Sequence, residues 1–177
     1  MIKVAFVMRV DAVSKPGGDL VQINKYIEWG RKLKAFDGEL VTDVFEGLEK
    51  YDVIHLTNID RPVEAIWHFS RARRLGKPIF ISTIHHSYNE IRKYEECARA
   101  GVLSLFSGRL RFQQMEILRS FFRSIRQPAL FLPTIWIALC GVKSGQQEVL
   151  LNSSKLLLLS NKEFADLVSD FDISPGF

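Results

Sequence analysis

I-K-V-A-F-V-M, residues 2–8, is a nearly unbroken apolar run, and S-K-P-G-G-D-L-V-Q, residues 14–22, follows it closely. An apolar run of this kind is typical of a strand that is buried on both faces of a parallel sheet. From residue 20 to residue 36 apolar side chains recur with helical spacing, which predicts an amphipathic helix with Asp19 as its N-cap. The chain therefore opens with a strand, a glycine-containing turn and a helix.

The same alternation continues along the chain. Short apolar runs predict further strands at residues 39–45, 51–59, 78–85 and 155–160. Helical patterns predict helices at residues 62–75, 87–100 and 162–171. Pro62 suits the start of the first of these helices, Gly76 its end, and Asn161 the cap of the last. Strands and helices in alternation predict an α/β fold in which helices flank a parallel sheet.

Residues 103–145 depart from this alternation, and we expect them to form a helical insertion. One helix is predicted at residues 109–126 and a second, very apolar one at residues 128–140. Residues 141–147 are predicted to be a loop.

The composition indicates a packed domain. The chain has 177 residues, of which 47% are hydrophobic and 25% are charged. A formal net charge of +4 is compatible with phosphate ligands or an anionic membrane surface but requires neither. Two cysteines supply neither a metal-binding spacing nor a disulfide framework, so we expect a reducing, cytoplasmic compartment. No apolar run approaches the roughly 20 residues of a membrane span, and the N-terminus reads as a strand rather than a signal peptide.

Two polar loops are predicted at the carboxyl ends of strands, where open α/β sheets bind their ligands. The first contains Gly17 and Gly18, which lack the spacing of a dinucleotide or nucleoside-triphosphate loop. These glycines form either a simple turn or a loop that lets a ligand approach the backbone. The second loop offers Thr57, Asn58 and Asp60 to a polyhydroxylated ligand, although Asp60 is also suited to capping the following helix.

A histidine pair ends the strand predicted at residues 78–85. Adjacent side chains on a strand point to opposite sides, so one of His85 and His86 is expected to face the ligand crevice. Histidine can donate or accept a proton near neutral pH, which makes this pair the candidate catalytic group. His55 is predicted to be structural, and His68 is predicted to lie on the surface or to pack against neighbouring residues.

The helix predicted at residues 109–126 alternates basic and apolar side chains. Such a helix is able to lie on an anionic membrane surface, or to pack on the core with a solvated arginine face. Its arginines are Arg109, Arg111, Arg119, Arg123 and Arg126.

Four segments, in order, resemble the N-terminal domain of a GT-B glycosyltransferase of the retaining family four kind. They are S-K-P-G-G-D-L-V-Q, Y-D-V-I-H-L-T-N-I, P-I-F-I-S-T-I-H-H-S and L-L-L-L-S-N-K-E-F-A-D-L-V-S-D-F-D-I. The resemblance covers residues 1–173, so residues 1–177 are expected to be one Rossmann-like domain. It implies an enzyme that transfers a sugar from a nucleotide sugar in bacterial cell-surface polysaccharide biosynthesis. The C-terminal domain that binds the nucleotide sugar in this family is absent from this chain.

The resemblance also implies roles for single residues. Gly17, Gly18 and Asp19 match the loop that lies against the donor diphosphate or sugar, and His85 matches the histidine that touches the transferred sugar. His86 stands where the family often has Asp or Gly. No metal or cofactor and no nucleic acid is implied. The expected partners are the donor-binding domain, a glycan or lipid-linked acceptor, and the inner face of the cell membrane.

Two other classes of function remain open from the residues themselves. The domain is also compatible with a non-catalytic, flavodoxin-like module in which the glycine loop holds a phosphate. It is equally compatible with an interaction domain that associates with membranes through residues 109–142.

Overall fold

The computed structural model describes residues 1–91, 93 and 112–173 and contains a five-stranded parallel sheet. The strand order is β2-β1-β3-β4-β5. The strands are β1 (Ile2–Val7), β2 (Phe36–Val41), β3 (Val53–Thr57), β4 (Ile79–Ser82) and β5 (Lys155–Leu157). Helices flank the sheet, so the predicted Rossmann-like α/β fold is confirmed.

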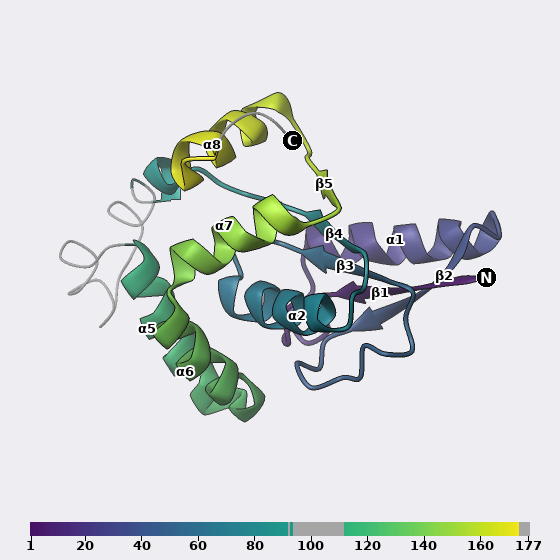
Figure 1. Ribbon diagram of the computed structural model, residues 1–177, viewed down its shortest axis with the longest axis horizontal. Coiled ribbons are helices and arrows are strands. Elements are labelled where there is room, and N and C mark those ends of the chain that lie inside the picture. The colour runs from purple at the N-terminus through teal and green to yellow at the C-terminus, as the bar shows by residue number, and fades with distance from the viewer. Residues whose placement is uncertain (92, 94–111, 174–177) are drawn as a thin grey trace.

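Two hydrophobic cores lie on opposite faces of the sheet. Val4 and Phe6 of β1 pack with Ile23 and Ile27 of α1 (Gly18–Lys32), whereas Ala5 and Val7 belong to the larger core. That larger core also contains α2 (Pro62–Arg74) and α7 (Val142–Asn152), which pack side by side (Figure 1). Because successive side chains of a strand point to opposite faces, a strand covered by helices on both faces is apolar throughout.

The region predicted as a helical insertion contributes to this larger core. It contains α5 (Phe112–Arg126), the 3-10 turn η1 (Pro128–Leu130) and α6 (Phe131–Cys140). Leu130 and Ile137 are fully buried, and α5 and α6 lie side by side at one end of the molecule (Figure 1). The last helix is α8 (Asn161–Phe171). Residues 94–111, which include part of two predicted helices, lie outside the described residues.

The loop predicted at residues 141–147 is wrong, because α7 begins at Val142. Gly141 has a φ of 92°, a conformation that ends α6 and lets the chain restart as a new helix. Gly145 lies against α2, and a Cβ atom there would be 2.7 Å from Cδ1 of Ile66. A glycine cluster that looks like a loop in the sequence therefore allows two helices to approach closely.

Two predicted helix caps are also wrong. Gly17 is the N-cap of α1, and Asp19 lies in the first helical turn, where its carboxylate accepts a hydrogen bond from Arg9. Ser160, rather than Asn161, caps α8, since its hydroxyl accepts a hydrogen bond from the Glu163 backbone N–H at 3.1 Å.

Strand boundaries differ from the sequence prediction. The strands predicted at residues 51–59 and 78–85 are shorter, Val53–Thr57 and Ile79–Ser82. The strand predicted at residues 39–45 is Phe36–Val41, three residues earlier at its start. The strand predicted at residues 155–160 is Lys155–Leu157, which lies at the edge of the sheet and has two of its three residues exposed.

Within the described residues, no single helix is long and apolar enough to cross a membrane. Pro128–Cys140 and Val142–Asn152 together meet that requirement by length and composition, but they meet at an angle of 92°.

Candidate functional site

A cavity of about 950 Å³ opens at the carboxyl ends of β1 and β3. In the order β2-β1-β3-β4-β5 this is the point where the connections change direction, and such points are where open α/β sheets bind ligands. One wall comes from the loop after β1, a second from the loop after β3, and a third from α5. Among the described residues, the basic ones that line the cavity are Arg9, Lys15, Arg61, Arg119, Arg123 and Arg126, and the acidic ones are Asp11, Asp60 and Glu116.

Arg9 is held in the first wall by its own loop. Its guanidinium donates to Asp11 at 2.8 Å, to Asp19 at 3.2 Å and to the carbonyl oxygen of Lys15 at 2.6 Å. Burial raises the pKa of Asp11, but the hydrogen bond from Arg9 and the positive charges of Arg9, Arg61 and Lys15 together outweigh it, and the pKa of Asp11 is lowered. The loop therefore presents a fixed cation beside an ionised carboxylate.

The glycines Gly17 and Gly18 shape this loop without lining the cavity. Neither has a positive φ. A Cβ at Gly17 would lie 2.7 Å from Oδ1 of Asp19 and 3.3 Å from Nη2 of Arg9. A side chain there would displace these two groups and disturb the hydrogen bond between them. Among the described residues, no atom lies within 4 Å of the position that a Cβ at Gly18 would take. A ligand-facing loop would require such open space.

The third wall turns two arginines of α5 inward. Arg119 pairs with Glu116, and Nη1 of Arg123 lies 3.6 Å from Oε1 of Glu64 in the first turn of α2. The side chains of Glu116 and Glu64 are 8% and 5% exposed, so buried carboxylates hold both guanidinium groups. The expected solvated arginine face is therefore absent at Arg119 and Arg123.

Two apolar side chains of α5 are exposed instead. Phe122 is 49% exposed and Ile125 is 77% exposed. Arg126 is exposed and lines the cavity, whereas Arg109 and Arg111 lie outside the described residues.

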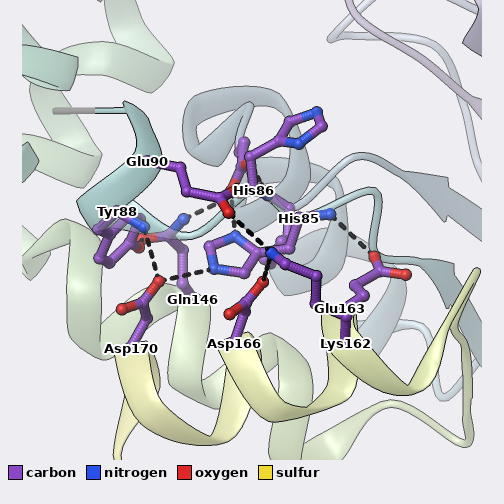
Figure 2. Close-up of polar contacts among 11 residues, drawn as sticks. His85, His86, Tyr88, Glu90, Gln146, Lys162, Glu163, Asp166 and Asp170 are labelled. Carbon is purple, nitrogen blue, oxygen red and sulfur yellow. Dashed lines mark hydrogen bonds and ion pairs between the residues drawn. The ribbon is translucent and has the colours of Figure 1, made fainter. Parts of the chain in front are cut away.

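Next to the cavity, His85 forms an ion cluster that joins three elements. Its Nδ1 lies 2.6 Å from Oδ1 of Asp60, after β3. Its Nε2 lies 3.1 Å from Oδ2 of Asp170 in α8 (Figure 2). The backbone N–H of His85 donates to Glu163 of α8 at 2.8 Å, and the backbone N–H of Tyr88 donates to Asp170 at 2.8 Å. Through this cluster α8 is tied to the loops that follow β3 and β4.

His85 is a buried cation in this arrangement. Burial of its side chain disfavours the charged form, but the hydrogen bonds with Asp60 and Asp170 and the negative charges of these two residues together outweigh burial, and the pKa of His85 is raised. A carboxylate oxygen lies within hydrogen-bond distance of each ring nitrogen, an arrangement that suits the protonated imidazole with its two donors. Both ring nitrogens of His85 are engaged by carboxylates, and its side chain is 0% exposed. His85 is linked to the cavity through its contact with Asp60, and Asp60 lines the cavity.

His86 has the opposite environment. Its side chain is exposed and points away from Asp170 and Glu163 (Figure 2). Only its backbone N–H joins the cluster, by donating to Oδ2 of Asp60 at 3.0 Å. Of the predicted histidine pair, His86 is therefore the one whose imidazole reaches solvent.

The loop after β3 divides its polar residues between structure and cavity. Thr57 is buried and donates to the carbonyl oxygen of Val7 at 2.8 Å, so it ties β3 to β1. Asn58 has a φ of 66° and accepts a hydrogen bond from the Asp60 N–H at 2.9 Å, which forms a tight turn in the cavity wall. The capping role considered for Asp60 is wrong, because Arg61 is the N-cap residue of α2 and that cap has no side-chain hydrogen bond.

The two other histidines are buried and neutral. Burial lowers the pKa of His55 to about 4, and its Nε2 lies 2.9 Å from the hydroxyl of Ser82. Burial also lowers the pKa of His68 to about 3, and His68 has no hydrogen-bond partner among the described residues. The described residues contain no group of three or more His, Cys, Asp or Glu side chains that would hold a metal ion.

Sequence reasoning missed Arg9, Arg61, Glu64, Glu116 and Asp170. One signal was available, since Glu116 precedes Arg119 by three residues on a predicted helix, a spacing that favours an ion pair. No local pattern links Glu64 or Asp170 to the cavity.

No protein-family model, curated protein or solved structure matches the chain.

Proposed function

We propose that the chain is the acceptor-side domain of a nucleotide-sugar-dependent glycosyltransferase. The observation that carries the proposal is the charged cavity at the carboxyl ends of β1 and β3. Its volume of about 950 Å³ is at the upper end of the usual size of small-ligand sites. The transferred product would be a glycan or glycolipid of the bacterial cell surface, made in the cytoplasm at the inner face of the membrane.

The walls of the cavity suit the two kinds of group that such a reaction brings together. Asn58 and Asp60 offer hydrogen-bond acceptors for sugar hydroxyl groups on one side. Arg9 and Lys15 offer positive charge on the other side, where it would balance the charge that develops on a departing diphosphate. In this proposal no metal is needed, and the nucleotide sugar is held by a second domain that faces the cavity.

The proposal requires a donor-binding domain in addition to this chain, so it is tested on the full natural protein. The protein is incubated with UDP-, GDP- and ADP-sugars and a bacterial lipid extract, and release of nucleoside diphosphate is measured. We expect release from one nucleotide sugar, stimulated by the acceptor fraction. No release with any donor, or a downstream reading frame without a second domain, would contradict transferase activity.

Gly18→Val tests the loop separately from the fold. The open space beside Gly18 accepts a valine without collision, so the thermal midpoint should stay within about 2 °C. In this proposal the donor sugar lies against the glycine loop, outside the cavity lining, so transfer should fall by more than tenfold because the valine would occupy that space. Gly18→Ala, which fills less of this space, should retain more activity than Gly18→Val. Equal activity of all three proteins would remove the loop from the reaction.

One observation favours a second candidate, a phosphate-binding module without chemistry. Both ring nitrogens of His85 are engaged by carboxylates, so this histidine has no free nitrogen for proton transfer. A module of this kind would bind pyrophosphate to the isolated chain and release no nucleoside diphosphate in the assay above.

A further inference from the structure

The charged cavity borders an apolar groove on α5. The groove has a volume of about 430 Å³ and is lined by Leu118, Phe121, Phe122, Ser124, Ile125 and Phe131. Phe122 and Ile125 line both hollows, so the two hollows meet along one side of the helix. None of the residues that line the groove carries a charge.

We propose that the cavity and the groove bind one amphiphilic ligand, a lipid phosphate or diphosphate. The phosphate head lies in the cavity, and the hydrocarbon chain follows the groove outward past Phe122 and Ile125. The inference deepens the proposed function, because it makes the acceptor a lipid-linked phosphate rather than a free glycan. Binding of such a ligand does not itself require transfer.

Charge and geometry in the cavity match a phosphate group. Guanidinium groups recognise phosphate oxygens with paired, charge-assisted hydrogen bonds. Arg119, Arg123 and Arg126 present such groups from successive turns of α5, and Arg9 faces them from the loop after β1. Basic side chains outnumber acidic ones among the described residues that line the cavity, as a ligand with more than one negative charge requires.

The arginines are held in place before a ligand arrives. Glu116 is buried and pairs with Arg119, while Ser120 accepts a hydrogen bond from Nη2 of Arg123 at 2.7 Å. Glu64, also buried, lies behind Arg123. Fixing these long side chains in advance reduces the entropy that binding would otherwise remove.

The groove accounts for the apolar side of α5. Phe122, Ile125 and Phe131 are between 49% and 77% exposed, and exposed apolar surface gathered in one place marks a binding site. A hydrocarbon chain suits a groove without charges. The concave cavity beside it encloses a single head group, whereas a bilayer surface would rest on a convex face.

The test measures binding of three probes to the purified chain by titration calorimetry. The probes are farnesyl diphosphate below its micelle concentration, inorganic pyrophosphate and farnesol. We expect farnesyl diphosphate to bind at least tenfold more tightly than pyrophosphate, since burial of two methylene groups is sufficient for that factor. Farnesol should bind at least tenfold more weakly than farnesyl diphosphate. Equal binding of pyrophosphate and farnesyl diphosphate would overturn the proposal in favour of a free phosphate ligand.

Substitutions of two exposed residues test binding of the phosphate head and of the hydrocarbon chain separately. Arg126→Glu should weaken pyrophosphate and farnesyl diphosphate by a similar factor of at least ten, and leave their ratio unchanged. Ile125→Gln, which is neutral and helix-compatible, should reduce the preference for farnesyl diphosphate and leave pyrophosphate binding within twofold. Arg74→Glu on α2 and Leu33→Gln after α1, exposed residues away from both hollows, are the matched controls. Effects in the controls as large as those in the two variants would overturn the proposal.

A vesicle experiment distinguishes one bound lipid from a charged membrane surface. Phosphatidylcholine vesicles that contain a few per cent of polyprenyl phosphate should retain the chain. Vesicles with the same charge supplied by phosphatidylglycerol should retain at least fivefold less. Equal retention would overturn the proposal in favour of a general anionic surface. Tight binding of farnesyl diphosphate without any nucleoside diphosphate release would leave this inference standing and contradict the transferase.

Discussion

Replacing His85 by leucine tests whether the ion cluster is structural. In the folded protein the His85 side chain is 0% exposed and lies between Asp60 and Asp170, which are 14% and 10% exposed. Leucine keeps apolar contact with Phe171 and Tyr88, whose rings lie 5.2 and 5.3 Å from the imidazole. It removes the cation and leaves two carboxylates facing an apolar side chain.

The expected loss of stability is large. Removing one partner of a buried ion pair costs about 3–5 kcal/mol, because the remaining charges stay buried without compensation. Typical domains have a free energy of unfolding of about 5–15 kcal/mol, so His85→Leu should shift the urea midpoint strongly and still leave a measurable transition. His86→Leu is the matched control, because the His86 side chain is exposed and only its backbone joins the cluster. It should change stability by less than about 0.5 kcal/mol.

The free energy of unfolding should also depend on pH, and above pH 6.5 it should fall as the pH rises. The pKa of His85 is raised from an ordinary value of 6.5, so above pH 6.5 the folded state holds a proton that the unfolded state has released. The stability that His85 contributes is therefore fully present below pH 6.5 and is lost as pH rises through the folded pKa, by up to about 1.4 kcal/mol per pH unit. The lowered pKa values of His55 and His68 act below pH 6.5 and do not affect this window.

The assay is urea unfolding of wild type, His85→Leu and His86→Leu, followed by circular dichroism between pH 7 and pH 9. Wild type and His86→Leu should lose stability with rising pH, and His85→Leu should be nearly flat. A loss below about 1 kcal/mol for His85→Leu, or the same pH slope in all three proteins, would refute the buried cation.

Three further substitutions probe the interior by the same unfolding assay. His68→Leu should stabilise the protein by about 1–2 kcal/mol at pH 7, because the buried ring nitrogens of His68 have no partner among the described residues. Its advantage should grow at pH 5, since the lowered pKa of His68 makes wild type lose stability as pH falls below 6.5; an equal advantage at both pH values would contradict this. Gly145→Ala should cost about 1–3 kcal/mol, because its Cβ would be 2.7 Å from Ile66, and Ile66→Val should recover part of the loss. Thr57→Val should cost about 1–2 kcal/mol by removing a buried hydrogen bond, while pyrophosphate binding stays within twofold.

Helices and strands with a strong pattern were predicted well from the sequence. The apolar run of β1 predicted a strand covered on both faces, and Pro62 and Gly76 correctly bracketed α2. Prediction failed where one residue type serves two purposes. Gly145 looked like a loop residue but permits close packing of helices, and Asp19 looked like a cap but holds Arg9.

The sequence by itself determined the alternation of strands and helices and the polar loops at the strand ends. Periodicity is a local property of the chain, and the carboxyl ends of parallel strands must meet at one edge of the sheet. Only the tertiary structure decided which polar side chains face the cavity. Arg119 and Arg123 turn inward because Glu116 and the distant Glu64 lie behind them, and His85 is sequestered because Asp170, 85 residues later, reaches its ring. The Arg123–Glu64 and His85–Asp170 pairs are formed by packing between segments far apart in the sequence, and charge compensation between distant residues leaves no mark in any local pattern.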